Sequence, residues 1–189
     1  MTDFEQPKRL TKMVIDDKCI EQVKKISFPL LYDDENEQLY EMHIRLLKVA
    51  MEKNNSNEVG FIINLMDWSH LEILGNEDGI ELRKVIEARD LFFTAPSNSL
   101  IFIHNHPKNS TFSEVDLKSF LAADSLLMIT VVCNNGRIYS LTKDQGFDDF
   151  KAISYYNHIY DNCNEEDSAV KEFLRTCKKV ELIYGYGGE

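Results

Sequence analysis

Long apolar runs are missing from this 189-residue chain. No stretch approaches the ~18 to 20 consecutive apolar residues that a membrane-spanning helix requires, so we expect no such helix. The first ten residues, MTDFEQPKRL, also contain no apolar segment of the kind found in signal peptides. These two absences predict a cytoplasmic protein that does not associate with a membrane.

Cysteine and proline are both scarce. The four cysteines are scattered without a CxxC pair, at Cys19, Cys133, Cys163 and Cys177. This spacing argues against a disulfide framework and against an all-cysteine zinc site, and it favours reduced thiols. The chain has only four prolines and no repeats or low-complexity tracts, so no linker between domains is apparent.

Basic residues are outnumbered in this sequence. Lys and Arg total 21 against 32 Asp and Glu, which gives a formal net charge of −11 and a pI of about 4.9. An acidic surface repels phosphate backbones, and no stripe of Lys or Arg interrupts it. Nucleic acid is therefore disfavoured as the main partner.

Hydrophobic residues are plentiful, at 43% of the chain, and aromatic residues reach 11%, so the chain can build one full core. Apolar spacing of three and four residues predicts helices over residues 36–53, 80–91 and 113–124. Apolar runs of strand length predict strands over residues 58–66, 70–74 and 99–104. Two more runs, 128–133 and 137–142, flank an Asn-Asn-Gly turn and predict a β-hairpin. The pattern predicts an α/β (α+β) protein, and the run at residues 99–104 is apolar on both faces, as in a central strand that is covered on both sides.

The two ends of the chain differ from this middle part, residues 36–146. Residues 1–35 form an N-terminal extension, in which MVIDDKCI (13–20) and KKISFPLLY (24–32) are expected as edge strands. Residues 147–189 carry two apolar stripes at helical spacing, which predict a helical hairpin and a tail that frays at its YGYGGE end. Acidic residues outnumber basic ones in this last segment, so the hairpin is a candidate docking element for a protein partner.

One segment has the residue types of a metal site: Ile101-Phe-Ile-His104-Asn105-His106-Pro107. Residues i and i+2 of a strand project from the same face, so His104 and His106 point together while Asn105 points away. Pro107 cannot continue a strand ladder and ends the strand. The segment therefore presents two imidazoles side by side at a strand terminus.

A carboxylate follows this strand after a six-residue loop. Ser113 begins a predicted helix whose first turn contains Asp116, a position where an anion is favoured. Ser-x-x-Asp is also the pattern of a helix capping box, and the two interpretations are compatible. Two imidazoles and one carboxylate make a three-ligand zinc site with an open fourth position, which is the arrangement used in catalysis.

The pattern His104-Asn-His106-Pro107…Ser113-x-x-Asp116 resembles the signature of the JAB/MPN-plus (JAMM) zinc metalloproteases, over residues 58–143. The resemblance implies an MPN/JAB-like (cytidine-deaminase-like) fold for residues 36–146, which is a mixed β-sheet flanked by helices. It implies one Zn²⁺ per chain, with His104, His106 and Asp116 as the ligands. It also implies that Ser113 assists the tetrahedral intermediate and that Glu58, just before an apolar strand, is the general acid/base.

Two details distinguish this chain within the family pattern. Six residues separate His106 from Ser113, where seven are commoner, so the serine is less securely placed than the ligands. Asn105 stands where the eukaryotic deubiquitinases have Ser or Thr, and the His-Asn-His-Pro form is similar to bacterial RadC-like and phage JAB domains. Glu41 and Glu52, on the preceding predicted helix, are alternative positions for the base.

The resemblance implies a zinc-dependent metallopeptidase or isopeptidase that acts on a protein or peptide, with ubiquitin-like conjugates among the candidate substrates. One alternative is a non-catalytic JAB/MPN interaction module. Another is an HNH-type nuclease or a RadC-like protein associated with nucleic acid, because the letters of residues 104–106 are His-Asn-His. An HNH site spreads these residues over a hairpin and a helix, which disfavours it here.

Overall fold

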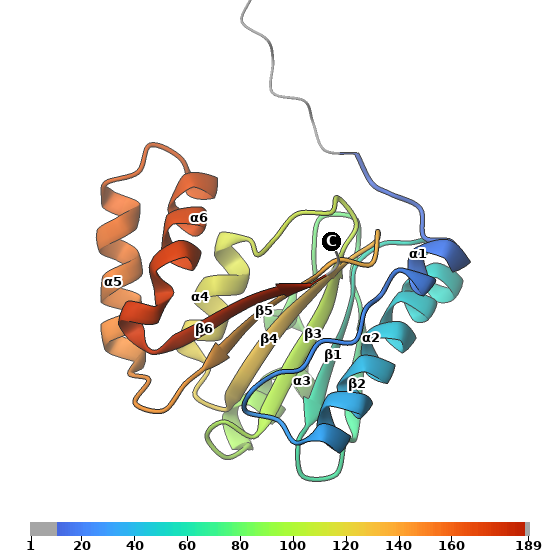
Figure 1. Cartoon of the computed structure of the whole chain (residues 1–189), viewed down its shortest axis with the longest axis horizontal. Helices are drawn as coiled ribbons and strands as arrows, with labels where there is room; N and C mark the ends of the chain where they lie inside the picture. The colour runs from blue at the N-terminus through green and yellow to red at the C-terminus, as the bar shows by residue number, and fades with distance from the viewer. Residues whose placement is uncertain (1–10, 188–189) are drawn as a thin grey trace, which may run out of the picture.

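A six-stranded sheet runs through the computed structural model, which describes residues 11–187 (Figure 1). Its strand order is β2-β1-β3-β4-β5-β6. β3 and β4 are parallel, and the other neighbouring pairs are antiparallel. The strands are β1 (Val59–Asn64), β2 (His70–Leu74), β3 (Leu100–His106), β4 (Leu126–Cys133), β5 (Ile138–Lys143) and β6 (Leu182–Gly187). The predicted mixed sheet is confirmed.

β3 is the centre of the sheet, and all seven of its residues are buried. A parallel neighbour requires a crossover connection, and α4 (Glu114–Ala122) provides it between β3 and β4. β4 and β5 form the antiparallel pair that the Asn-Asn-Gly turn predicts, with Gly136 in the left-handed region at φ 83°. The loop from β3 to α4 therefore lies at the end of the most buried strand.

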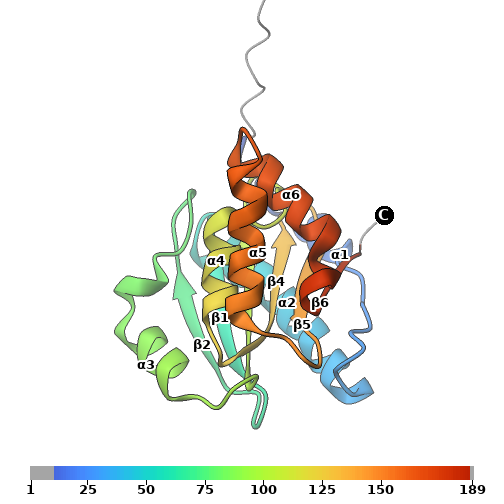
Figure 2. The same ribbon diagram turned by 90° about the vertical axis from the view of Figure 1, so that its left-hand side faces the viewer.

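Helices cover both faces of the sheet, so the α/β class is confirmed (Figure 2). α2 (Asp33–Lys53) packs on one face, and α4, α5 (Asp149–Asp161) and α6 (Glu166–Thr176) pack on the other. β3 serves both cores because successive side chains alternate. Leu100 and Phe102 belong to the core under α4, α5 and α6, whereas Ile101 and Ile103 belong to the core under α2.

The helix expected over residues 80–91 is divided into two elements. A short 3-10 helix, η1 (Leu82–Lys84), precedes α3 (Ile86–Thr94). Ile80, Leu82 and Val85 contact the core from irregular chain and η1, so the apolar residues of this segment do not share one helical face. The prediction of one continuous helix is therefore wrong, although the apolar residues that suggested it do pack against the core.

The edge strands expected within residues 13–32 are wrong. This segment contains α1 (Asp17–Glu21), which Asp16 caps by accepting from the Cys19 amide at 2.9 Å, and otherwise runs without regular structure. Its apolar residues, including Ile15 and Val23, pack into the core on the α2 face instead of joining the sheet. The edges of the sheet are β2 and β6.

The C-terminal hairpin of two helices is confirmed as α5 and α6, but the frayed tail is wrong for residues 184–187. After a second 3-10 helix, η2 (Cys177–Val180), Glu181 takes a left-handed φ of 54° and returns the chain along β5 as β6. Leu182 and Tyr184 alternate into the core with α5 and α6. Gly185 and Gly187 interrupt the apolar pattern, so the sequence does not indicate this strand. A side chain at position 187 would collide with Ile26. Residues 188 and 189 lie outside the described part.

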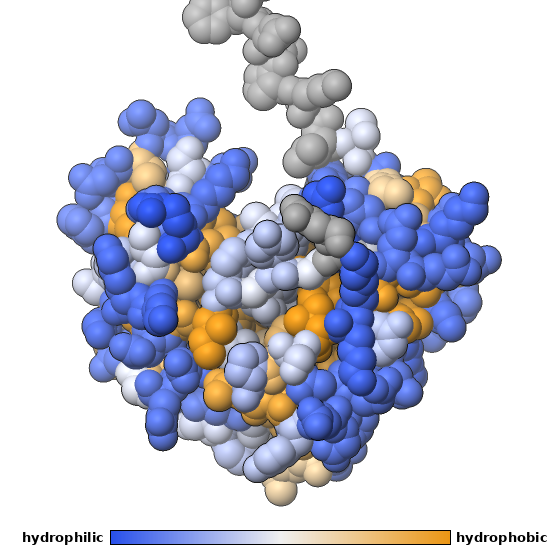
Figure 3. Space-filling model, in the orientation of Figure 1, coloured by the Kyte–Doolittle hydropathy of each residue, from blue (hydrophilic) through white to orange (hydrophobic). Residues whose placement is uncertain are grey.

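Within residues 11–187, no helix has both the length and the apolar character needed to cross a membrane. The face in view in Figure 3 carries hydrophilic residues over the helices at its two flanks. Apolar residues reach the surface in the middle of this face, between the C-terminal helices and the N-terminal segment.

Candidate metal centre

β3 brings two imidazoles together where the strand ends. His104 is fully buried and His106 is 8% exposed. Their Nε2 atoms are 3.1 Å apart. Both rings project from the face that α4 covers, as the i, i+2 spacing predicts, while the side chain of Asn105 lies elsewhere.

The first turn of α4 adds a carboxylate to this pair. Ser113 is the N-cap of the helix, and its Oγ accepts from the Asp116 amide at 3.1 Å. In return, the Ser113 amide and hydroxyl donate to Asp116 Oδ2 at 2.7 and 2.6 Å. This capping box turns the carboxylate toward the imidazoles, with Oδ1 3.3 Å from His104 Nε2 and Oδ2 3.4 Å from His106 Nε2.

The spacing of these three groups fits a metal ion. Ligand atoms at about 2.0–2.1 Å from a tetrahedral zinc are separated from one another by about 3.3–3.4 Å. The two Nε2 atoms are 3.1 Å apart, His104 Nε2 is 3.3 Å from Asp116 Oδ1, and His106 Nε2 is 3.4 Å from Asp116 Oδ2. Two nitrogens and one oxygen are also a donor set that zinc accepts. The two imidazole nitrogens and the Asp116 carboxylate therefore approach one another at about the spacing of zinc ligands, with one carboxylate oxygen facing each imidazole.

The two rings are oriented by different contacts. His106 Nδ1 is 3.1 Å from the Ser110 carbonyl oxygen and 3.0 Å from the Ser110 hydroxyl. The carbonyl can only accept and the hydroxyl can accept as well, so a proton on Nδ1 satisfies both contacts and leaves the Nε2 lone pair facing the cluster. His104 Nδ1 is buried and has no hydrogen-bond partner among residues 11–187. The His104 ring instead stacks on the Phe102 ring at a centroid distance of 4.9 Å. Nothing in the sequence indicated Ser110 or Phe102, because a loop serine and a core phenylalanine carry no distinctive spacing.

Electrostatics at the cluster favour a cation. Burial alone would raise the pKa of Asp116, but the charge and hydrogen bonds of His104, followed by those of His106, outweigh it and hold that pKa well below 3.8. Burial alone would lower the pKa of His106, but hydrogen bonding and charge from Asp116 outweigh it and raise the pKa. The carboxylate that stabilises a protonated imidazole here would equally stabilise a metal ion in place of the proton.

A second carboxylate, that of Glu58, also lies close to the histidine pair. Glu58 immediately precedes β1 and is 7% exposed. Glu58, His104 and His106 each offer a ligand atom, all within 4.8 Å of one another, so this buried cluster could hold a metal ion. Burial raises the pKa of Glu58, and the charge of Asp116 adds to this, while the two imidazoles oppose it.

The two carboxylates therefore differ in character. Asp116 approaches both imidazoles and stays ionised, as a ligand must. Glu58 is more easily protonated, as a group that takes up and returns a proton must be. Opposite pKa shifts on neighbouring acids are a common sign that one is electrostatic and the other takes part in proton transfer.

Other candidate residues do not join the cluster. Glu41 and Glu52, the alternative positions for the base, are exposed on α2. Of the three remaining histidines, His43 on α2 is buried, with Nε2 2.9 Å from Thr130 Oγ1, and His158 is exposed on α5. The third, His70, lies on β2 with its ring centroid 4.8 Å from that of Phe61. Glu58 is accordingly the glutamate that the fold delivers to the histidine pair.

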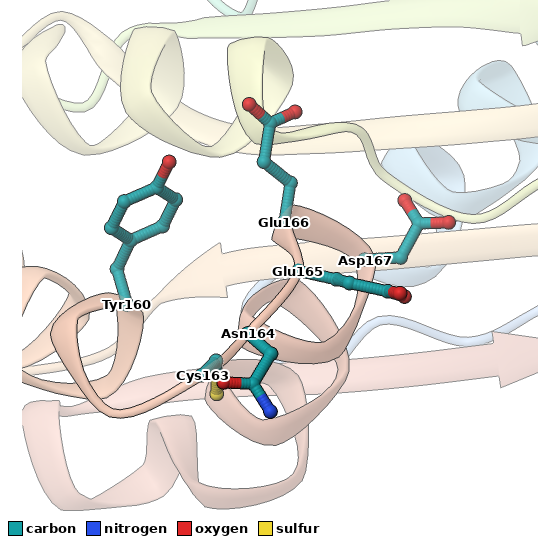
Figure 4. Close-up of a pocket in the computed structure, with 6 residues that line it drawn as sticks. All are labelled: Tyr160, Cys163, Asn164, Glu165, Glu166 and Asp167. Atoms are coloured by element: carbon teal, nitrogen blue, oxygen red, sulfur yellow. The ribbon is translucent and has the colours of Figure 1, made fainter.

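A surface hollow of about 440 Å³ lies elsewhere, at the turn between α5 and α6 (Figure 4). Its lining is mainly acidic and polar: Tyr160, Cys163, Asn164, Glu165, Glu166 and Asp167. No imidazole faces it among these residues, and none of them belongs to the histidine cluster. The hollow is therefore separate from the candidate metal centre.

Comparison of the chain with models of known protein families, with curated proteins and with solved structures found no match. The interpretation of the cluster accordingly depends on its geometry and chemistry.

Proposed function

We propose that this chain is a zinc-dependent metallopeptidase or isopeptidase of the JAB/MPN-plus type, built on an MPN/JAB-like fold. The observation that carries the proposal is the close approach of His104, His106 and Asp116, at 3.1–3.4 Å from one another, beside the buried Glu58. Such a site suits hydrolysis of an amide bond in a peptide or in an isopeptide-linked, ubiquitin-like conjugate.

The residues of the cluster have different roles in the proposed hydrolysis. His104 and His106 would hold the metal through Nε2, and Asp116 through a carboxylate oxygen. When bound, zinc supplies a Lewis acid and a water whose pKa is lowered to about 7. Glu58 accepts a proton from the attacking water on its carboxylate and donates it to the leaving amine.

Ser113 has a more constrained position than the other residues. Its single hydroxyl proton is donated to Asp116 Oδ2 in this structure. To assist the tetrahedral intermediate, the hydroxyl must exchange this bond for one to the oxyanion. We therefore assign Ser113 first to holding the ligand Asp116 and second to the oxyanion.

A protein partner is also part of the proposal. Acidic residues gather at the turn between α5 and α6, where Glu165, Glu166 and Asp167 follow one another. We propose this hairpin as the docking element for a partner or substrate protein.

Metal analysis tests the first half of the proposal. Protein purified without added metal is expected to contain close to one zinc per chain, and His104→Ala is expected to abolish it. Absence of zinc from the wild-type protein, even after incubation with excess zinc, contradicts the proposal.

Hydrolysis tests the second half. A pool of fluorescence-quenched peptides and an isopeptide-linked ubiquitin-like conjugate are incubated with the zinc-loaded protein, with and without chelator. Glu58→Gln is expected to lower the rate about 10²- to 10⁴-fold while zinc content is unchanged. Glu52→Gln, an exposed glutamate on α2, is the matched control. Cutting of duplex DNA that is lost in His104→Ala supports a nuclease, and zinc binding without any cleavage supports an interaction module.

A further inference from the structure

The residue between the two histidines has its own set of contacts. Asn105 is completely buried. Its Oδ1 accepts from the Val59 amide at 2.7 Å, and its Nδ2 donates to the Asn57 carbonyl at 3.2 Å. Asn57 and Val59 are the residues on either side of Glu58. One amide side chain therefore bridges the backbone across Glu58.

The backbone of Glu58 itself is held by the neighbouring loops. Its amide donates to the Asn76 carbonyl at 3.0 Å, and its carbonyl accepts from Gly75 and Asn54 at 2.8 Å each. These hydrogen bonds hold the start of β1 against the loop that follows β2. Asn105 supplies the contact from the other side, from β3.

A second buried asparagine fixes Asn105 in turn. Asn134, fully buried at the turn between β4 and β5, accepts from Asn105 Nδ2 at 2.7 Å. Its own Nδ2 donates to the Met13 and Ser56 carbonyls at 2.7 and 3.1 Å. Both protons and the oxygen of the Asn105 side chain are thus used, so the amide cannot rotate without losing buried hydrogen bonds.

We propose that Asn105 is a positioning residue, which sets Glu58 against the metal cluster by holding the backbone on both sides of it. The inference rests on the proposed function, because it concerns the base of that reaction. Alternation along β3 places His104 and His106 on one side and Asn105 on the other. Three consecutive residues therefore supply two of the proposed ligands and the side chain that holds the backbone around the proposed base. A misplacement of about 1 Å at a catalytic group can lower the rate about 10²-fold. Holding the base and two of the ligands from the same short segment of β3 keeps their relative positions fixed.

Hydrogen exchange at single amides tests the positioning without any substrate. Asn105→Ala is expected to speed exchange of the Val59 amide at least tenfold, because Asn105 Oδ1 is its acceptor. The matched control is Asn36→Ala, which removes another buried asparagine with hydrogen bonds to Phe28 and Leu31 at the far end of α2. Exchange at Val59 that is unchanged in Asn105→Ala, or equally fast in Asn36→Ala, overturns the inference.

A double-mutant cycle on the hydrolysis of the quenched-peptide pool tests the consequence for the reaction. Asn105→Ala is expected to lower kcat about 10²-fold with little change in KM and with zinc content retained. In the Glu58→Gln background the same substitution is expected to change the rate less than threefold, because Asn105 acts through Glu58. An equal loss in both backgrounds overturns the inference.

Two further outcomes separate this inference from the proposed function. If the wild-type protein neither binds zinc nor cleaves, the proposed function fails, whereas the exchange measurement still decides whether Asn105 holds the backbone around Glu58. If Asn105→Ala is insoluble, Asn105→Ser keeps one polar group in the same place and is expected to give the same direction of change in exchange and in kcat.

Discussion

At the scale of single residues, the proposed zinc site needs all three of its ligands. His106→Ala and Asp116→Ala are each expected to lose most of the bound zinc, because two ligands hold zinc far more weakly than three. Both variants are expected to stay folded, since the ligands lie on a strand and a helix already packed in the core. Zinc per chain and circular dichroism measure the two effects, with the exposed His158→Ala as the control. Full zinc occupancy in either variant means that the ligand set is wrong.

A histidine outside the cluster predicts how stability depends on pH. Burial lowers the pKa of His43 from 6.5 to about 3, so the folded protein keeps this ring neutral where the unfolded chain protonates it. Between pH 6.5 and 3 the unfolded state binds the extra proton, and the free energy of unfolding therefore falls as the pH falls, by at most about 1.4 kcal/mol per pH unit from this residue.

His43→Gln is accordingly expected to flatten the loss of stability between pH 6.5 and 3. Glutamine has no proton to gain, and its amide can still face Thr130. Urea unfolding at a series of pH values checks this, with the exposed His158→Gln expected to follow the wild-type curve. If the free energy of unfolding falls equally steeply with pH in the wild type and in His43→Gln, the lowered pKa of His43 is wrong.

The sequence predicted much of the site at this scale. His104 and His106 follow from strand alternation, and Asp116 follows from its place three residues after a helix cap, because both relations are local. The convergence of Glu58 depends on pairing between β1 and β3, which only the resemblance implied. Asn105 was expected to point away, but its bridge across Glu58 depends on partners 46 and 48 residues distant, for which spacing gives no signal.

At the scale of elements, α4 depends on the same serine that holds its carboxylate. Ser113→Ala is expected to cost about 1 kcal/mol of stability through the lost cap. It is also expected to weaken zinc binding about 10- to 100-fold, because Asp116 Oδ2 loses its hydroxyl donor. Competition with a chelator and urea unfolding measure the two quantities.

Ser113→Thr and Ser119→Ala are the controls for this helix. Threonine keeps a hydroxyl at the cap and is expected to restore both quantities. Ser119 lies in the same helix without contributing to its cap, so its loss is expected to change neither. Unaltered zinc affinity in Ser113→Ala identifies the serine as a cap alone.

The elements that the sequence mispredicted depend on contacts between residues far apart in the chain. Local pattern reports that a segment is apolar, but not whether it pairs with a strand or packs as irregular chain on a face. Residues 13–32 therefore look like strands, although their apolar side chains fill the core under α2. β6 was missed for a different reason. Its glycines weaken the apolar pattern by which a strand is recognised in the sequence, and the strand forms because it pairs with the edge of β5.

At the scale of the whole molecule, the C-terminal part belongs to the body of the fold. Leu182→Ala is expected to cost about 2–5 kcal/mol of unfolding free energy, because Leu182 is 1% exposed within the core. Tyr186→Ala, in the same strand but 62% exposed, is expected to cost far less. Denaturant unfolding compares them, and a loss for Leu182→Ala as small as that for Tyr186→Ala means that β6 is dispensable.

β5 and β6 are neighbours in the sheet, yet α5 and α6 stand between them along the chain. A chain leaving the ribosome therefore presents the open edge of β5 until the whole hairpin has been synthesised. Closing that edge is a non-local step, which is slower than forming a tight hairpin. At high concentration, a β6 from a second copy competes for the same edge, so strand exchange between chains is the expected route to misassembly during refolding.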